Sequence, residues 1–286
     1  MCPLRPATPE PAGNDPAARL RANLQALRAR IARAAERAGR DPAGVRLVAV
    51  TKSVEAPTAA LLPDLGVLDL GESRVQELER KATSAPHRGP AGPPPGADPV
   101  RWHLIGHLQR NKVRRALRWA GWLHSLDSLR LLEALEQAAA LEQVRPRVYF
   151  EVRLAAGSAA PGQPERTGFD PGELPELLAR ARDLGHVRPV GLMAMGPAPD
   201  AAGAAPGADP LAEQAASRAV FAELAALRER WRDRAAEVFE DGAIQLSMGM
   251  SFDLEAAIAE QSDVVRVGTA LFEGVELARD PTEAGA

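Results

Sequence analysis

The chain has 286 residues, 45% of them hydrophobic, which is enough to bury a sizeable core in one large α/β domain or in two modest ones. Its formal net charge of -3 argues against a broad basic surface, so we expect no nucleic-acid partner. The only cysteine, Cys2, excludes an internal disulfide framework and suits a reducing compartment. No stretch is long and apolar enough to span a membrane, so we expect no membrane partner and a cytoplasmic location.

The first expected element is a helix that follows a short tail. Residues 1–14 are rich in Pro and Ala and are expected to form a disordered tail. Asp15 suits the N-cap of a helix, and Pro16 suits its first position. Apolar residues then recur every three or four positions, at Leu20, Leu24, Leu27 and Ile31. We expect this helix to end near Gly39.

Eight short apolar runs follow, and each is expected to form a strand. They are 45–51, 67–71, 102–106, 122–126, 147–154, 187–195, 243–248 and 264–268. Helical periodicity occurs between several of them, at 73–83, 128–143, 172–184 and 211–236. This alternation predicts a parallel sheet, and eight repeats favour closure into a single (β/α)8 TIM-type barrel over residues 15–280. An open, doubly wound sheet is the alternative.

Two segments interrupt the alternation of strands and helices. Residues 85–99 and 197–210 are dominated by Pro, Gly and Ala, a composition that cannot form a core. We interpret both as flexible insertions into the barrel rather than as domain boundaries.

Lysine is rare in this chain, although positive charges are common. Of 35 Lys and Arg residues, only Lys52, Lys81 and Lys112 are lysines. An arginine cannot lose its proton or condense with a carbonyl, whereas a desolvated lysine amine can do both. Lys52 directly follows the first strand, where a barrel places functional groups, and we expect it to be a partly desolvated nucleophile. Lys81 is expected to be a solvated helix residue, and Lys112 to lie on the surface or to contact an anion.

The last two strands are followed by segments that suit a phosphate group. Barrels commonly bind phosphate with the loops after strands seven and eight. There, Ser247 and Thr269 can donate hydroxyls, Gly249 and Gly268 allow close approach to an anion, Ser251 is expected to cap the next helix, and Arg266 is expected to point toward the mouth. In a closed barrel, strands one and eight are neighbours, so a phosphate here would lie beside Lys52. A cofactor that carries both an aldehyde and a phosphate fits both ends of the chain.

The same residues lie in motifs that resemble a known family. The motifs are AVTK (49–52), GESRVQEL (71–78), WHLIGHLQRNKVRRAL (102–117), HSLDSLRLLEAL (124–135), GLMAM (191–195) and LSMGMSFDLEAAI with VVRVGTALF (246–272). Together they resemble the pyridoxal phosphate homeostasis protein family, whose members are single-domain barrels similar to the N-terminal domain of bacterial alanine racemase. The resemblance implies pyridoxal 5′-phosphate as cofactor, a Schiff base on Lys52, phosphate contacts from Ser247, Gly268 and Thr269, and Arg266 facing the pyridine nitrogen.

The resemblance also bears on whether the protein is an enzyme. An arginine beside the ring nitrogen keeps that nitrogen unprotonated and weakens the cofactor as an electron sink. The only tyrosine, Tyr149, lies inside the fifth expected strand, where we expect a core or rim residue rather than the second acid/base group that racemisation needs. We therefore expect a protein that holds the cofactor and supplies it to enzymes lacking it, without efficient turnover. We also expect a monomer, because the resemblance does not extend to the second racemase domain, which makes the usual dimer contact. Two alternatives remain: an amino-acid racemase or related enzyme that uses Lys52, and a lyase or isomerase that forms a Schiff base with a sugar phosphate.

Three weaker candidates for the cofactor site are Ser73, Gly249 and His103. Ser73 stands where the family usually has Asn, and with Gln76 it is expected to form a capping box. His103, His107 and Gln109 are expected to contact the rim of the site. His103 and His107 straddle a strand end and a loop rather than one helix face, so we expect no metal site.

Overall fold

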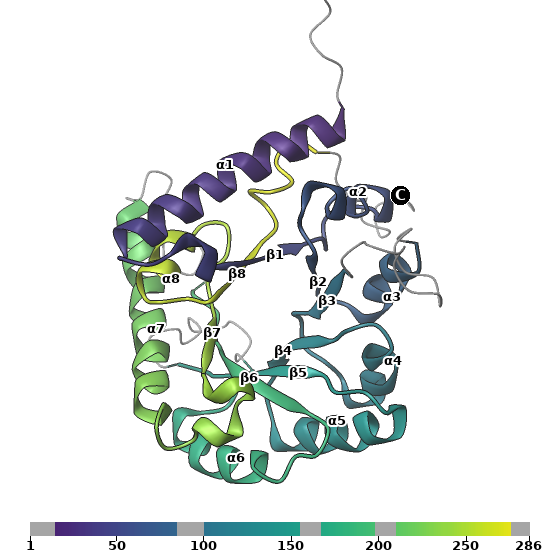
Figure 1. Cartoon of the computed structure of the whole chain (residues 1–286), viewed down its shortest axis with the longest axis vertical. Helices are drawn as coiled ribbons and strands as arrows, with labels where there is room; N and C mark the ends of the chain where they lie inside the picture. The colour runs from purple at the N-terminus through teal and green to yellow at the C-terminus, as the bar shows by residue number, and fades with distance from the viewer. Residues whose placement is uncertain (1–14, 85–99, 155–166, 198–209, 276–286) are drawn as a thin grey trace, which may run out of the picture.

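Eight parallel strands close into a barrel in the computed structural model, which describes residues 15–84, 100–154, 167–197 and 210–275 (Figure 1). Each strand pairs with the next along the chain, and the last pairs with the first. The strands are Arg46–Val50 (β1), Asp69–Glu72 (β2), Arg101–Leu104 (β3), Trp122–Leu126 (β4), Arg147–Glu151 (β5), Arg188–Met193 (β6), Gln245–Ser247 (β7) and Val264–Val267 (β8). The closure confirms the predicted (β/α)8 barrel and excludes the open sheet.

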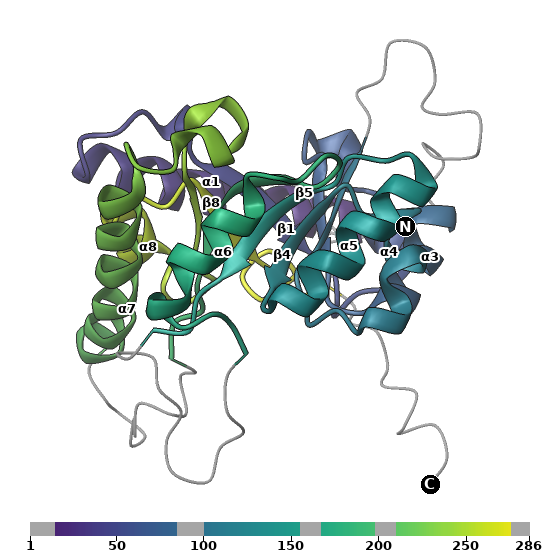
Figure 2. The ribbon, with the colours of Figure 1, turned by 90° about the horizontal axis from the view of Figure 1, so that it is seen from below.

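Helices surround the strands, as Figures 1 and 2 show. They are Pro16–Arg37 (α1), Ala56–Ala59 (α2), Val75–Ser84 (α3), Val113–Leu117 (α4), Leu129–Glu142 (α5), Leu174–Ala181 (α6), Pro210–Trp231 (α7) and Leu254–Ala259 (α8). Short 3-10 turns lie at Pro42–Gly44, Pro63–Leu65, Arg110–Lys112, Pro171–Glu173, Ala236–Val238 and Glu240–Gly242. The predicted tail 1–14 and insertion 85–99 lie outside the described residues, as does the insertion 197–210 except for its two end residues.

The helix α1 begins as the sequence predicts. The Asp15 carboxylate accepts a hydrogen bond from the Ala17 N–H at 3.0 Å, and Pro16 occupies the first position. The helix ends at Arg37, and Gly39 adopts a φ of 66° just beyond it. Its buried face packs against α8, so α1 lies on the outside of the barrel near the seam where β8 pairs with β1 (Figure 1).

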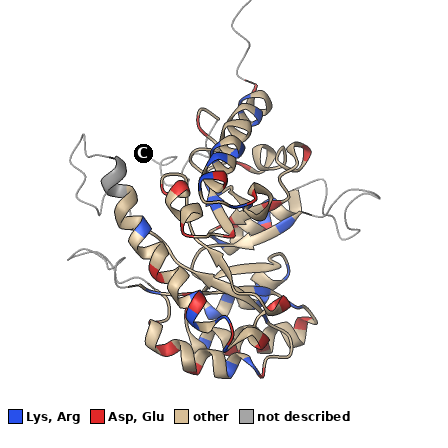
Figure 3. Cartoon of the chain, turned by 60° about the vertical axis from the view of Figure 1, so that its left-hand side comes forward, with Lys and Arg blue, Asp and Glu red and all other residues tan. Residues whose placement is uncertain are grey.

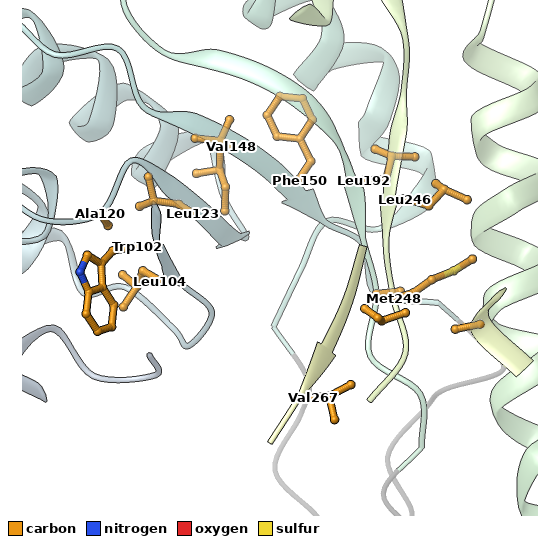
Figure 4. Close-up of a cluster of buried hydrophobic side chains, with 14 of the residues drawn as sticks. Trp102, Leu104, Ala120, Leu123, Val148, Phe150, Leu192, Leu246, Met248 and Val267 are labelled. Atoms are coloured by element: carbon orange, nitrogen blue, oxygen red, sulfur yellow. The ribbon is translucent and has the colours of Figure 1, made fainter. Parts of the chain in front are cut away.

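Both faces of the strands are buried, in two separate hydrophobic clusters. Alternate strand residues such as Val148 and Phe150 point outward and pack beneath the helices (Figure 4). The residue between them, Tyr149, points into the barrel with Val48, Trp122, Val190, Met193 and Val264. Burial on both faces is the usual state of a parallel sheet. The barrel interior is therefore filled with side chains, and function belongs to the ends of the strands.

Acidic and basic residues are interspersed over the helices, as Figure 3 shows. Within the described ranges, no helix combines the length and the apolar character that crossing a membrane requires.

Candidate functional site

Lys52 lies two residues after β1, at the end of the barrel where the strands terminate. Its side chain is exposed, so the expected partial desolvation is not what the structure shows. Its backbone is nevertheless anchored through Thr51, which is fully buried. The Thr51 N–H donates to the Gly71 carbonyl at 2.9 Å, and its hydroxyl donates to the Glu72 carboxylate at 2.8 Å. An exposed amine thus extends from a backbone that is fixed by hydrogen bonds.

Lys81 completes this anchor, and its predicted position in solvent is wrong. Only 2% of the residue is exposed, and Glu72 beside it is fully buried. The Lys81 ammonium donates to the Glu72 carboxylate at 2.5 Å and to the Thr51 carbonyl at 2.6 Å. The polar composition around Lys81 hid the fact that α3 turns this residue toward the barrel. All three backbone and side-chain polar groups of Thr51 are therefore hydrogen-bonded.

The segment after β8 lies next to β1, as the closed barrel requires. Ala49 pairs with Val267, so the next residue, Gly268, lies against Val50. A Cβ on Gly268 would be 3.0 Å from the Val50 carbonyl oxygen, which explains why the chain approaches so closely here. Thr269 is exposed at the same edge. The structure thus brings Lys52, Gly268 and Thr269 to one part of the rim.

Ser251 belongs to this part of the rim and is not a helix cap. The helix α8 begins at Leu254 and its N-cap position is Asp253, two residues beyond Ser251. The Ser251 hydroxyl instead accepts a hydrogen bond from the Ala270 N–H at 3.2 Å, next to Thr269. This contact joins the segments that follow β7 and β8.

The helix α1 holds both of these segments from outside. Arg30 donates to the Ser251 carbonyl at 3.1 Å and forms a bidentate ion pair with Glu255 at 2.9 and 3.0 Å. About two turns earlier on the same helix, Asn23 donates to the Leu271 and Glu273 carbonyls. The helix that precedes the barrel therefore fixes the backbone of the candidate phosphate loops.

Ser247 and Arg266 lie deeper in the barrel than the rim. Ser247 is fully buried and Arg266 is 5% exposed. Arg266 Nη1 donates to the Ser247 hydroxyl at 2.6 Å, and Nη2 donates to the Ala194 carbonyl at 3.2 Å. The guanidinium is thus held in one orientation by two acceptors.

Two histidines extend this network from Ser247 through the barrel interior toward Asp69. His124 Nδ1 is 2.8 Å from the Ser247 hydroxyl oxygen, and its Nε2 is 2.9 Å from His103 Nδ1. His103 Nε2 is 2.9 Å from Asp69, whose carboxylate also receives two hydrogen bonds from Arg101. His103 is therefore inside the barrel and not at the rim as expected.

The two other weak candidates are Gly249, which has a structural explanation, and Ser73, which lies in another part of the rim. Gly249 adopts a φ of 93°, and a Cβ there would lie 2.4 Å from the Ala257 Cβ, so the glycine admits α8. Ser73 lies on the β2 side and lines a hollow of about 380 Å³ with His107, Gln109 and Lys112. Helix α3 begins at Val75, so Arg74 rather than Ser73 precedes its first residue.

The remaining predictions concern Tyr149 and metal binding. Tyr149 is fully buried, and its hydroxyl donates to Gln245 at 2.7 Å near the opposite end of the barrel. Burial raises the pKa of this phenol. Of the two positions expected for this tyrosine, core or rim, the structure shows the core. Within the ranges that the structure describes, no group of three or more His, Cys, Asp and Glu side chains is arranged to hold a metal ion.

Sequence reasoning missed Glu72, Lys81, Asp69 and His124 as members of buried networks. The rarity of lysine was a signal for Lys81, because a buried amine that binds two oxygen atoms is a reason to retain lysine. For His124, the signal was an ionisable residue in the middle of a strand whose other residues, apart from Ser125, are apolar. Neither signal reveals the partners, since they come from other segments of the chain.

Comparison with known proteins agrees with the fold and the motifs. A family model described as the N-terminal domain of alanine racemase matches residues 22–275. A pyridoxal phosphate homeostasis protein of Pseudomonas aeruginosa is 36% identical over 251 residues, which cover 87% of this chain and 93% of that protein. The chain belongs to the pyridoxal phosphate homeostasis family.

Two solved structures are similar along nearly their whole length. PipY of Synechococcus elongatus, solved with pyridoxal phosphate bound, is 29% identical with a TM-score of 0.68, over 88% of this chain and 99% of that one. A protein of Bifidobacterium adolescentis described as unknown is 31% identical with a TM-score of 0.75, over 90% of this chain and 96% of that one. These two proteins and this chain therefore share the whole barrel.

Proposed function

We propose that this protein binds pyridoxal 5′-phosphate as a Schiff base on Lys52 and stores it without efficient turnover. The observation that carries the proposal is the meeting of Lys52 with the Gly268–Thr269 segment at one edge of the closed barrel. Family membership and the cofactor bound to PipY support the choice of cofactor. When bound, pyridoxal phosphate supplies an aldehyde that condenses with an amine and a ring that withdraws electrons.

The residues at this edge fit the cofactor's chemistry. Lys52 offers a primary amine that is free to reach an aldehyde. Thr269, Ser251 and the backbone at Gly268 offer hydrogen-bond donors to a phosphate, on segments that α1 holds in place. We propose that these three hold the phosphate. Ser247, expected among the phosphate ligands, lies deeper and is already bonded, so we propose that it supports Arg266 instead.

Arg266 and Tyr149 support the proposal of storage rather than turnover. A guanidinium fixed by two acceptors keeps its charge, and facing the pyridine nitrogen it would leave that nitrogen unprotonated. Tyr149 is sealed inside the barrel and cannot act as a second acid/base group at the rim. We propose that the recipients are enzymes that lack their cofactor, that the protein acts as a monomer, and that it works in the cytoplasm, where its single cysteine stays reduced.

The test is the visible spectrum of the protein after reconstitution with pyridoxal phosphate. The wild-type protein is expected to be yellow, and borohydride is expected to bleach it and fix the adduct to the peptide that contains Lys52. Lys52→Ala is expected to lose the visible band. Lys112→Ala is the matched control and is expected to keep it. A colourless wild-type protein, or an adduct on another residue, contradicts the proposal.

Storage is tested separately from binding. The loaded protein is incubated with a panel of amino acids in deuterated water, and exchange of the α-proton is followed by NMR. No exchange beyond that of free pyridoxal phosphate is expected. Multiple turnovers with any amino acid would replace storage by catalysis and favour the racemase alternative.

A further inference from the structure

A continuous chain of hydrogen bonds runs through the barrel interior, from the end where the strands begin toward the mouth. It starts at Asp69, the first residue of β2, and ends at Ser247, the last residue of β7. The links are Asp69 to His103 at 2.9 Å, His103 to His124 at 2.9 Å, and His124 to Ser247 at 2.8 Å. His103, His124 and Ser247 are fully buried, and Asp69 is 6% exposed. We call these four residues the relay.

The chemistry of Asp69 fixes the direction of every bond in the relay. The Asp69 carboxylate accepts two hydrogen bonds from Arg101, at 2.7 and 2.6 Å. An ionised carboxylate has no hydrogen to donate, so the proton between it and His103 sits on His103 Nε2. A neutral imidazole carries one N–H, which leaves His103 Nδ1 as an acceptor. His124 must then donate from Nε2, and its own Nδ1 accepts.

Ser247 is the last member of the relay, and its hydroxyl hydrogen points into the barrel, toward His124. Because His124 Nδ1 accepts, the Ser247 hydroxyl donates to it, and the oxygen of Ser247 accepts from Arg266 at 2.6 Å. In this state Ser247 has no hydrogen for a ligand at the mouth. We infer that Asp69, His103 and His124 are positioning residues for the cofactor site, because they turn the Ser247 hydroxyl inward and make its oxygen the acceptor that orients Arg266. This inference deepens the proposed function and rests on it for the role of Arg266.

The surroundings favour the neutral form of both histidines. Burial lowers the pKa of His103, with Asp69 opposing and Arg46 and Arg101 adding to the effect. Burial also lowers the pKa of His124 well below its usual value, and the positive charges of Arg266 and Arg46 act in the same direction. The other faces of His124 and His103 meet rings rather than carboxylates, with Tyr149 stacked on His124 at 4.5 Å and Trp122 on His103 at 5.3 Å.

One proton added to His103 reverses the direction of the hydrogen bonds from His103 to His124 and from His124 to Ser247. His103 would then donate from both nitrogens, His124 would accept at Nε2 and donate from Nδ1, and the Ser247 hydrogen would be released toward the mouth. The proton would enter at the Asp69 end, where Asp69, Arg46 and Arg101 line a hollow of about 440 Å³. The direction of one hydroxyl at the cofactor site is thus set at the opposite end of the barrel.

The direct test is the tautomer of each histidine, measured by long-range ¹H–¹⁵N correlation on the protein without cofactor at pH 7. His103 and His124 are both expected to be neutral with the hydrogen on Nε2. His107 and His186 are internal controls of opposite sense, since their Nδ1 atoms face Asp127 and Glu136. An Nδ1–H tautomer or an imidazolium at either relay position overturns the inference.

Two variants show which end sets the direction. Ser247→Ala is expected to leave both tautomers unchanged, because the order is imposed from Asp69. Asp69→Asn replaces an obligate acceptor by an amide that can also donate, so Nδ1–H forms of both histidines are expected to appear; a buried aspartate fixes a histidine tautomer in the serine-protease triad in the same way. If Asp69→Asn does not fold, the Ser247→Ala result decides alone, because changed tautomers there would place control at the Ser247 end.

The link to the cofactor is read from the spectrum of the loaded protein across pH. Ser247→Ala and Asp69→Asn are both expected to shift the pH dependence of the visible band in the same direction. Glu136→Gln, which alters a carboxylate bound to the surface residue His186, is the control and is expected to leave it unchanged. An unshifted band in both relay variants overturns the positioning role. If the wild-type protein binds no pyridoxal phosphate, the proposed function fails while the tautomer measurement still stands.

Discussion

Two buried polar networks support the same end of the barrel, and they differ in the charge of their members. Beside Lys52, the network of Thr51, Glu72 and Lys81 contains a full ion pair. Beneath Arg266, the relay passes through two histidines whose lowered pKa values favour the neutral form. The first network joins neighbouring segments at the rim, whereas the second runs through the barrel interior.

The difference separates two ways of organising a site. A buried ion pair fixes position strongly, and removing one partner leaves a charge without compensation. A chain of neutral donors and acceptors contributes less attraction, but every member has a defined direction that one proton can reverse. The ion pair is therefore expected to dominate stability, and the relay to dominate the response to pH.

The largest expected effect is the loss of the ion pair in Lys81→Met. Methionine has a similar length but leaves the buried Glu72 carboxylate without its cation, so the free energy of unfolding should fall by about 3–5 kcal/mol. Chemical denaturation measures it. Lys112→Met is the matched control and should change the free energy by less than about 0.5 kcal/mol.

A second substitution checks that the loss comes from the unpaired charge. Adding Glu72→Gln to Lys81→Met removes the stranded charge, and stability should recover in part. An equal loss in the single and double variants would mean that packing, rather than charge, explains the effect.

Thr51→Val should have the next largest effect on stability. The substitution keeps the shape of the side chain but removes the hydroxyl that donates to Glu72 at 2.8 Å. Because the acceptor is charged, the free energy of unfolding should fall by about 1.5–3 kcal/mol. Ser247→Ala is the comparison from the relay. The Ser247 hydroxyl donates to a neutral histidine, and only the bond that it accepts from Arg266 involves a charge. Its loss of unfolding free energy should therefore be smaller. The reverse order would contradict the contrast between the networks.

Which of these features could be read from the sequence depends on whether they follow chain order. The eight strands and α1 follow from local periodicity. The meeting of Lys52 with Gly268 follows once the barrel closes, because the first and last strands must then be neighbours. Neither deduction requires knowing where any side chain points.

The parts that sequence reasoning missed depend on the direction of side chains. In a parallel barrel both strand faces are buried, so alternation does not reveal which residues face inward. His103 was therefore expected at the rim, although it points into the barrel with His124. Lys81 was expected in solvent because its sequence neighbours are polar. Its partners Glu72 and Thr51 become neighbours only after β1 and β2 pair.

The relay should dominate the pH dependence of stability. Because the pKa values of His103 and His124 are lowered in the folded protein, the unfolded chain binds more protons below about pH 6.5. The stabilisation present above that pH is lost as the pH falls, by up to about 1.4 kcal/mol per pH unit for each histidine. Denaturation of His124→Gln between pH 7 and 5 should show a shallower slope than the wild type. An unchanged slope would show that this histidine does not titrate on unfolding.

The smallest expected effect on stability is that of Lys52, which extends from the anchor, in contrast to Lys81, which is part of it. Lys52 is exposed, so Lys52→Ala without cofactor should change the free energy of unfolding by less than about 0.5 kcal/mol, in contrast to Lys81→Met. With pyridoxal phosphate present, the wild type should gain stability with cofactor concentration, and the variant should gain less. Thermal unfolding with and without cofactor measures both. A large loss in Lys52→Ala without cofactor would mean that this amine contributes to the stability of the fold, and the separation between an exposed amine and its fixed anchor would not hold.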